Sequence, residues 1–153
     1  MQKITANLWF KGAAEEAVNF YLSVFPESKI ISTMYYPKDG KEGLADFQKE
    51  FAGKVLAIDF ELFGQRFIAI NAGSEFTFNE AVSFNIACKD QAEIDYYWDK
   101  LTTNGGEESV CGWCKDKYGL SWQVNPENMP DLMKKPGAFA KMMEMKKIVI
   151  ADF

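Results

Sequence analysis

The hydrophobic pattern of the first half of the chain predicts one helix and four strands. Over residues 13–25 apolar side chains recur at three- and four-residue spacing, the buried stripe of an amphipathic helix. Over 4–10, 54–62 and 65–71 the pattern predicts strands, and the last two flank a tight Phe-Gly turn typical of a hairpin. The run 29–36 begins with β-branched residues and is predicted to be a further strand.

The second half repeats this order and adds a tail. Its elements are expected as strands at 81–88, 108–115 and 120–125, a helix at 91–103 with Asp90 as its N-cap, and helical residues at 129–147 broken at Pro136-Gly137. The apolar end at 148–153 is expected to dock on the fold. Residues 37–52 are polar and predict a loop or connection, with or without a short helix, and 72–80 link the two halves.

The chain contains an internal repeat. Residues 7–21 align with residues 83–97 at a constant shift of 76 positions. Matching positions carry similar apolar side chains: Leu8 with Phe84, Phe10 with Ile86, Val18 with Ile94, and Phe20-Tyr21 with Tyr96-Tyr97. A repeated strand–helix unit constrains the architecture more firmly than local propensities do.

Each copy is therefore expected to fold as a β-α-β-β-β module of an α+β protein. The modules span residues 1–73 and 79–126, and residues 127–153 form a C-terminal helical tail, all within a single domain 1–153. A helix on one side of a sheet buries only one sheet face. The other face must line a cleft or pack on a partner.

Composition narrows the classes of partner. With 48% apolar residues in a chain of 153, a packed core is expected. The net charge of −5, with acidic and basic residues interspersed, argues against nucleic acid as a partner. No apolar run approaches the ~18 residues of a membrane span, and no signal-peptide core is evident, so no membrane contact and a cytoplasmic location are expected.

Imidazole and thiol chemistry are both disfavoured. The chain has no histidine, which removes the commonest general base and metal ligand. Its three cysteines, an odd number, argue against a disulfide framework. Cys111 and Cys114 have the spacing of a redox pair, but such pairs need a helix N-terminus, and here a strand is predicted. A structural role is the alternative that the pattern favours.

Strand faces and aromatic clusters suggest where a ligand could bind. Strand alternation places Val55, Ala57, Asp59 and Glu61 on one face, and Leu56, Ile58, Phe60 and Leu62 on the other. The second set suits the helix-covered side, so Asp59 is expected on the open face. The chain has more aromatic and amide side chains than the packing of one helix layer on a sheet requires. They are Trp9, Asn71, Phe76, Phe78, Trp113, Trp122 and Gln123. They suit a small-molecule pocket, or else core and dimer contacts.

Several stretches, in order along the chain, resemble one known family. They are Leu8-Trp-Phe-Lys-Gly-Ala-Ala-Glu-Glu-Ala17, Phe63-Gly64-Gln-Arg-Phe67, Asn71-Ala-Gly73, Glu80-Ala-Val-Ser-Phe84, and Cys111-Gly-Trp113 followed by Lys115-Asp-Lys-Tyr-Gly-Leu-Ser-Trp-Gln-Val124. With the duplication, they resemble the vicinal oxygen chelate superfamily of glyoxalases, extradiol dioxygenases and bleomycin-resistance proteins. The chain is most similar to its PhnB-like branch, often labelled 3-demethylubiquinone-9 3-methyltransferase. The resemblance implies a glyoxalase-like, curved mixed-sheet cup and a homodimer.

In metal-dependent relatives, four His, Glu or Gln side chains from the strands hold one divalent cation. The resemblance carries these positions to Asn7, Ile68, Ser83 and Gln123, or with a shift of one residue to Ala6, Phe67 and Val82. Of these, Gln123 alone is a plausible ligand type. No metal and no cofactor are therefore expected.

Three functions compete. The first is a small-molecule binding protein with a degenerate metal site and no assigned reaction, whose ligand-binding residues would be Asn7, Trp9, Asp59, Asn71, Ser83, Trp122 and Gln123. The second is a metal-dependent lyase, isomerase or dioxygenase, which needs a cation to polarise a substrate oxygen. The third is the methyltransferase of the family label, but no glycine-rich loop here follows a strand and opens a helix. Whether the protein is an enzyme stays open, with a purely structural dimer as a further alternative.

Overall fold

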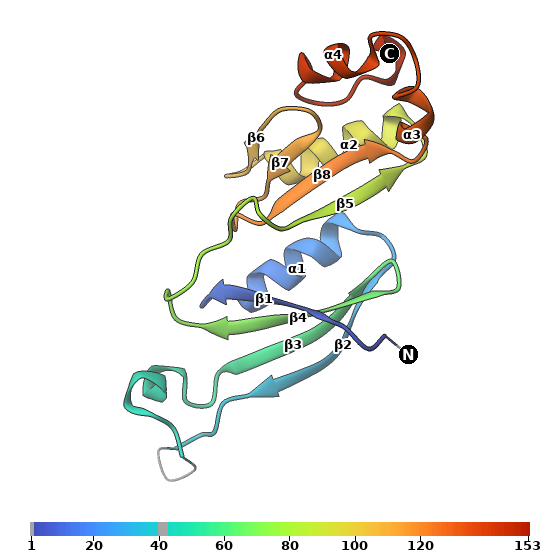
Figure 1. The fold of residues 1–153 in the computed structure, drawn as a ribbon. Coiled ribbons are helices and arrows are strands. Elements are labelled where there is room, and N and C mark those ends of the chain that lie inside the picture. The colour runs from blue at the N-terminus through green and yellow to red at the C-terminus, as the bar shows by residue number, and fades with distance from the viewer. Residues whose placement is uncertain (1, 40–42) are drawn as a thin grey trace. The chain divides into compact units, whose positions relative to one another are not determined.

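A computed structural model describes residues 2–39 and 43–153 (Figure 1). The chain forms two compact units, Met1–Thr77 and Phe78–Phe153. The curved cup that the two modules are expected to form together stays a prediction. Residues 40–42, part of the loop expected at 37–52, lie outside the described residues.

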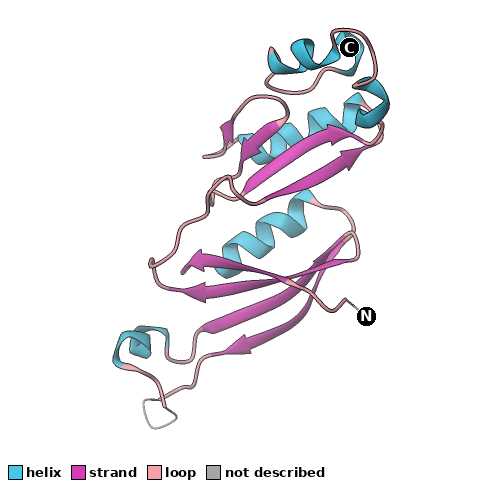
Figure 2. Cartoon of the chain, viewed as in Figure 1, coloured by secondary structure: helices cyan, strands magenta, loops and turns pink. Residues whose placement is uncertain are grey.

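The first unit is a four-stranded mixed sheet with a helix against it (Figures 1 and 2). Its elements are β1 (Ala6–Lys11), α1 (Ala14–Val24), β2 (Ser28–Tyr35), the short 3-10 helix η2 (Asp46–Phe51), β3 (Val55–Leu62) and β4 (Gln65–Ala72). The strand order is β1-β4-β3-β2, with β1 parallel to β4 and the other neighbours antiparallel. Phe63 and Gly64 have φ of 49° and 77°, as a two-residue hairpin turn requires. The predicted β-α-β-β-β order is confirmed.

The core of the first unit lies between α1 and one face of the sheet. Val18 and Tyr21 on α1 are buried, and the Tyr21 ring stacks on Phe60 of β3 with 6.3 Å between ring centroids. Phe60 stacks in turn on Phe67 of β4 at 5.5 Å. Since strand side chains alternate, Trp9 and its neighbours on β1 and β4 that point the other way form the free face of this sheet.

A β-bulge reverses the expected sides of the first two residues of β3. The register with β2 shifts at Leu56, which is the extra residue of the bulge. Alternation predicted Leu56 on the α1 side and Val55 with Asp59 on the other side. Instead, Val55 lies near Ile58 on the α1 side, and Leu56 lines a cavity with Trp9. The rest of the predicted alternation along β3 is correct.

The second unit repeats the topology of the first. Its elements are β5 (Ser83–Cys88), α2 (Gln91–Thr102), β6 (Glu107–Glu108), β7 (Trp113–Lys115) and β8 (Ser121–Pro126). The strand order is β5-β8-β7-β6, with β5 parallel to β8 and the remaining pairs antiparallel. The duplication inferred from the sequence is thus present in the topology of both sheets.

The single strand predicted over 108–115 is wrong, because the chain turns back within it. β6 and β7 pair as a separate hairpin around residues 109–112. Cys111 and Gly112 have φ of 56° and 81°, in the left-handed region that an extended strand lacks. Their N–H groups donate to the carbonyls of Met145 and Lys146, both at 2.8 Å. A segment remote in sequence therefore holds the turn. The alternation of apolar and polar residues within 108–115 cannot reveal such a contact.

α2 begins at its predicted N-cap. The Asp90 side chain accepts a hydrogen bond from the Glu93 N–H at 2.9 Å, and the Glu93 carboxylate accepts one from the Lys89 N–H at 2.9 Å. The first bond satisfies a donor that the helix start leaves free, and the second ties the residue before the N-cap to the first turn. No helix within residues 2–39 and 43–153 combines the length and apolar character that crossing a bilayer requires.

The C-terminal tail is helical, broken and docked, as predicted. It contains α3 (Met129–Leu132), α4 (Ala138–Met143) and the 3-10 helix η3 (Ile150–Asp152), and Gly137, with φ of 74°, precedes α4. The Gln91 amide donates to the Ile148 carbonyl at 3.0 Å and accepts from the Ile150 N–H at 2.9 Å. Ile148 is fully buried. The tail is therefore part of the core of the second unit.

Candidate functional site

The first unit contains a cavity of about 510 Å³ on the free face of its sheet. Strands β1, β3 and β4, the helix η2 and the segments that follow β2 and β4 all contribute to it. Its apolar wall consists of Trp9, Tyr36, Phe47, Phe51, Leu56, Ile70 and Ala72. Gln48 and Glu75 add two polar side chains. We call this cavity the aromatic pocket, and its composition is that of a small-molecule site.

Trp9 is a fixed wall of the aromatic pocket. Its indole Nε1 donates a hydrogen bond to the Gly73 carbonyl at 2.8 Å. Its ring meets that of Phe76 edge-on, with centroids 4.9 Å apart and an interplanar angle of 81°. Because the indole N–H is already bonded, Trp9 offers a ligand its ring surface.

Tyr36 ties the pocket wall to the sheet. Its hydroxyl donates to the Asn71 carbonyl at 2.7 Å, and its ring stacks on Phe51 of η2 at 5.4 Å. Burial raises the pKa of Tyr36 above its ordinary value, and the negative charge of Glu75 raises it further. Tyr36 therefore stays a neutral phenol, with its proton committed to the backbone.

Asn7, Trp9 and Asp59, all expected to bind ligand, share the free face of the first sheet, and of the three Trp9 lines the aromatic pocket. Asn7 lies outside it and donates its amide to the Thr5 carbonyl at 3.1 Å. The Asp59 carboxylate is paired with the Arg66 guanidinium, with 3.2 Å between Arg66 Nε and Asp59 Oδ1. The structure thus provides Asp59 with a positively charged partner from β4.

Asn71 does not lie where a ligand-binding role would place it. It is 7% exposed and faces α1. Its amide donates to the Val55 carbonyl at 2.9 Å, and its Oδ1 accepts from the Ala14 N–H at 3.3 Å. Alternation along β4 contained the signal, since Asn71 shares its side with Phe67 and Ala69, which are both buried.

In the second unit, Ser83 and Gln123 come together and Trp122 lies apart from them. Gln123 donates its amide to the Ser83 hydroxyl at 2.9 Å, on the sheet face away from α2. Trp122 is 4% exposed on the α2 side, and its Nε1 donates to Asp116 Oδ2 at 2.9 Å. We therefore assign Trp122 to the core and correct its expected place in a ligand pocket.

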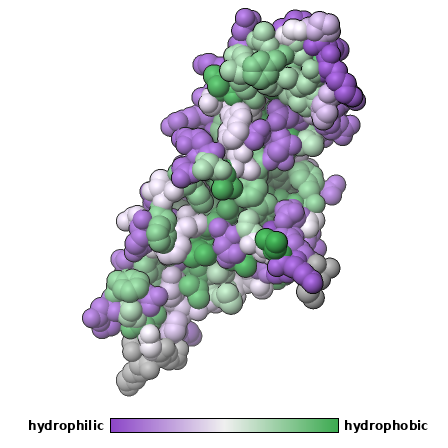
Figure 3. Space-filling view, in the orientation of Figure 1, coloured by the Kyte–Doolittle hydropathy of each residue, from purple (hydrophilic) through white to green (hydrophobic). Residues whose placement is uncertain are grey.

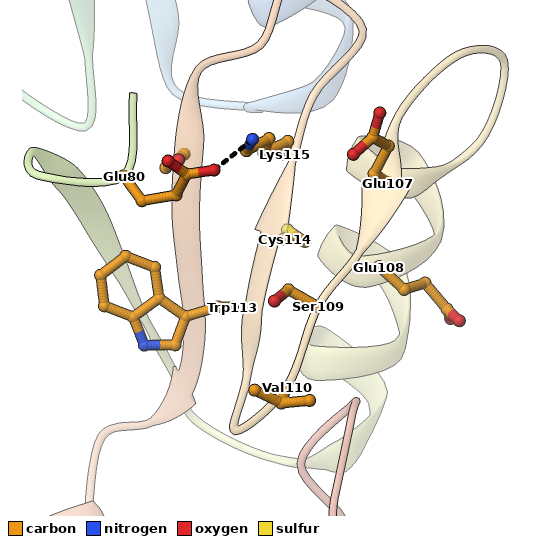
Figure 4. A pocket seen from close by; sticks show the side chains of 9 residues that line it. Glu80, Glu107, Glu108, Ser109, Val110, Trp113, Cys114 and Lys115 are labelled. Atoms are coloured by element: carbon orange, nitrogen blue, oxygen red, sulfur yellow. Dashed lines mark ion pairs between the residues drawn. The ribbon is translucent and has the colours of Figure 1, made fainter. Parts of the chain in front are cut away.

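The second unit has a different cavity, of about 500 Å³, near β6, β7 and the start of β8 (Figure 4). Glu80 and Lys115 point toward each other across it and form an ion pair. The hydrogen bond between them raises the pKa of Lys115 and lowers that of Glu80, so both stay charged at neutral pH. Ser121 also lines this cavity, and its buried hydroxyl has no hydrogen-bond partner among the described residues.

We call this second cavity the charged pocket. Sequence reasoning missed it because Glu80 precedes β5 and Lys115 lies on a strand whose true bounds the sequence did not show. An ammonium that is held charged is a poor nucleophile. Lys115 therefore suits electrostatic binding rather than covalent chemistry.

The cysteines do not form a reactive pair. Burial raises the pKa of Cys88 and of Cys114 to about 12 in each case, with neighbouring carboxylates acting in the same direction. Cys111 lies in the β6–β7 turn, with its sulfur 3.5 Å from that of Met143. All three are free thiols. The expected structural role is supported for Cys114, and Cys88 is buried as well, whereas Cys111 is not on a strand.

The positions that the resemblance assigns to metal ligands do not suit a divalent cation. Asn7 pairs with Ile68, which has no donor atom, and the Gln123 amide is bonded to Ser83. Such ions prefer imidazole, carboxylate or thiolate ligands, and this set offers amide and hydroxyl oxygens. Within 2–39 and 43–153, no group of three His, Cys, Asp or Glu side chains is placed to hold an ion.

Comparison with known proteins identifies relatives of the whole two-unit chain. The PhnB protein of Bacillus cereus is 37% identical, with a TM-score of 0.68 over 82% of this chain and 99% of its own. Protein PA1353 of Pseudomonas aeruginosa is 18% identical, with a TM-score of 0.64 over 83% and 98%. The fosfomycin resistance protein FosX of Listeria monocytogenes, solved with Mn(II) and 1S,2S-dihydroxypropylphosphonic acid, is 14% identical, with a TM-score of 0.56 over 87% and 99%.

The last two similarities are distant and concern the fold alone. No functionally curated protein gives a significant match. Residues 2–125 match the family described as 3-demethylubiquinone-9 3-methyltransferase. This match spans both sheets, and the similarity to the Bacillus cereus protein extends over the same two units. The chain therefore belongs to that family and has the glyoxalase-like fold of its PhnB-like members.

Proposed function

We propose that this protein binds a small organic molecule in the aromatic pocket of its first unit. The observation that carries the proposal is a cavity of about 510 Å³ walled by four aromatic and three aliphatic side chains. Apolar walls supply binding energy through buried area, and a few polar groups orient the guest. The mainly apolar residues that line the cavity are suited to binding, and no reaction is assigned to them.

A metal-dependent reaction has less support. FosX was solved with Mn(II), but the equivalent positions proposed for this chain offer amide and hydroxyl groups instead of a strong donor set. We therefore regard the metal site as degenerate. A methyltransferase activity, as the family label suggests, is also poorly supported, because both sheets are mixed rather than doubly wound and parallel.

Three probes of nearly equal shape test the proposal, namely benzylammonium, benzyl alcohol and benzoate. We expect at least one of them to change the tryptophan emission saturably. Trp9→Phe should abolish most of that change and weaken binding measured by ligand-observed NMR by about threefold, since the smaller ring covers less apolar area.

The matched control is Trp113→Phe, which alters the charged pocket in the same way. It should leave binding and most of the emission change intact. If the response survives in Trp9→Phe and disappears in Trp113→Phe, the ligand binds in the second unit. That result, or the absence of binding by all three probes at millimolar concentration, would contradict the proposed site.

The homodimer expected from the sequence is a further proposal. Strand β2 lies at the edge of the first sheet and exposes Ile30, Ile31, Met34 and Tyr35. Apolar surface is also visible over the strands of this unit in Figure 3, between polar side chains. An apolar edge strand is suited to pairing with a second copy. Sedimentation that shows a monomer at about 100 µM would contradict the dimer.

A further inference from the structure

Glu75 is the charged residue of the aromatic pocket. Among the described residues that line the cavity, it is the one with an ionised side chain, because Tyr36 is held as a neutral phenol. The remaining walls are aromatic, aliphatic or amide. One carboxylate therefore sets the sign of the electrostatic field in a cavity that is otherwise apolar.

The Glu75 carboxylate and the Trp9 indole both lie close to Gly73 and both line the pocket. A Cβ atom on Gly73 would lie 2.7 Å from each carboxylate oxygen of Glu75, so the side chain folds back over Gly73. The Gly73 carbonyl is also the acceptor for Trp9 Nε1, at 2.8 Å. Glycine at position 73 thus leaves the space that the Glu75 carboxylate occupies, next to the residue that holds the indole.

Within residues 2–39 and 43–153, Glu75 has no ion-pair partner. Its negative charge nevertheless acts on Tyr36, another residue of the pocket wall, and contributes to the raised pKa of that phenol. The faces of aromatic rings are also electronegative, because their quadrupole places negative charge there. A neutral or anionic guest leaves this combined negative field uncompensated, whereas a cation compensates it.

We propose that the ligand of the aromatic pocket is an organic cation, an alkyl- or arylammonium group whose charge lies between the Glu75 carboxylate and the rings of Trp9 and Tyr36. This inference rests on the proposed function and names its ligand class. Aromatic walls with an acidic residue are a recurring solution for ammonium recognition, which combines cation–π attraction with an ion pair. The net charge of −5 further favours the approach of cations.

The same three probes test the inference, now compared with one another. Benzylammonium should bind about tenfold more tightly than benzyl alcohol, and benzoate should bind least, because one nearby carboxylate acts with opposite sign on the two ions. In Glu75→Gln, the preference for benzylammonium should fall to about twofold, while the affinity for benzyl alcohol stays within about twofold of its original value. Added salt should reduce the preference in the wild type and have little effect in the variant.

Glu80→Gln is the matched control, since it removes one negative charge from the other pocket. It should preserve the preference for the cation. Gly73→Ala is a second test, because the new methyl group displaces the flexible carboxylate and should reduce the preference without loss of stability.

The possible failures are distinguishable. Equal binding of benzylammonium and benzyl alcohol, or tightest binding of benzoate, would overturn the cation inference and leave the small-molecule site intact. A preference for the cation that persists in Glu75→Gln but disappears in Glu80→Gln would overturn the role of Glu75. No binding by any of the three would overturn the proposed function itself.

Discussion

Replacement of Asp116 by alanine is expected to lower the free energy of unfolding by about 3 kcal/mol. Asp116 is 2% exposed, and its carboxylate accepts hydrogen bonds from Tyr118, Leu120 and Trp122. Oδ1 accepts from the N–H groups of Tyr118 and Leu120, at 2.9 and 3.2 Å, and Oδ2 accepts from Trp122 Nε1 at 2.9 Å. Alanine would leave three donors without this partner in a turn that joins β7 to β8.

Urea unfolding followed by circular dichroism measures the effect. Asp116→Asn should fall between wild type and alanine, because its oxygen can still accept from the two backbone N–H groups while its NH₂ group would face the Trp122 N–H. Asp131→Ala removes an exposed carboxylate paired with Lys134 and should change stability by less than about 0.5 kcal/mol. An Asp116→Ala protein within about 1 kcal/mol of wild type would contradict this account of the turn.

Replacement of Asn71 by alanine should cost about 2 kcal/mol of unfolding free energy. α1 begins after Ala13, which cannot supply a capping side chain, and Asn71 Oδ1 accepts from the N–H of Ala14 instead. The amide of Asn71 also satisfies the Val55 carbonyl beside the bulge in β3. The variant therefore loses a helix cap and a bond to a neighbouring strand together.

Asn7→Ala is the matched control, since Asn7 lies on the free face and bonds to Thr5, two residues away. We expect its stability to change by less than about 0.5 kcal/mol. The measurement is again urea unfolding, with probe binding recorded on the same samples. If Asn71→Ala keeps full stability and loses probe binding, Asn71 has the ligand role predicted from the sequence and the structural role is wrong.

The repeat made the architecture predictable, because two copies of one pattern had to satisfy the same fold. What escaped prediction depends on contacts between segments remote in sequence. The β6–β7 turn is held by Met145 and Lys146, and local alternation cannot register that contact. The bulge at Leu56 is a property of the pairing between β2 and β3 and leaves no mark in the pattern of β3 alone.

The candidate site was predictable in its kind and only partly in its residues. Trp9 was identified because it belongs to the aromatic side chains that exceed what one helix layer requires, and it lines the aromatic pocket. Phe47 and Phe51 were missed. They lie on η2, in a polar connection whose contact with the pocket arises only in the folded chain. Asn71 and Trp122 were expected to bind ligand, but both are buried on the helix-covered side of their sheets, as the buried neighbours that share their strand faces indicate.

Each unit completes its own backbone ladder and encloses its own core. A side chain that changes in one pocket therefore need not disturb the packing of the other. The same topology thus carries an aromatic pocket in the first unit and a charged pocket in the second. A change of ligand specificity in one unit is therefore compatible with an unchanged core in the other unit.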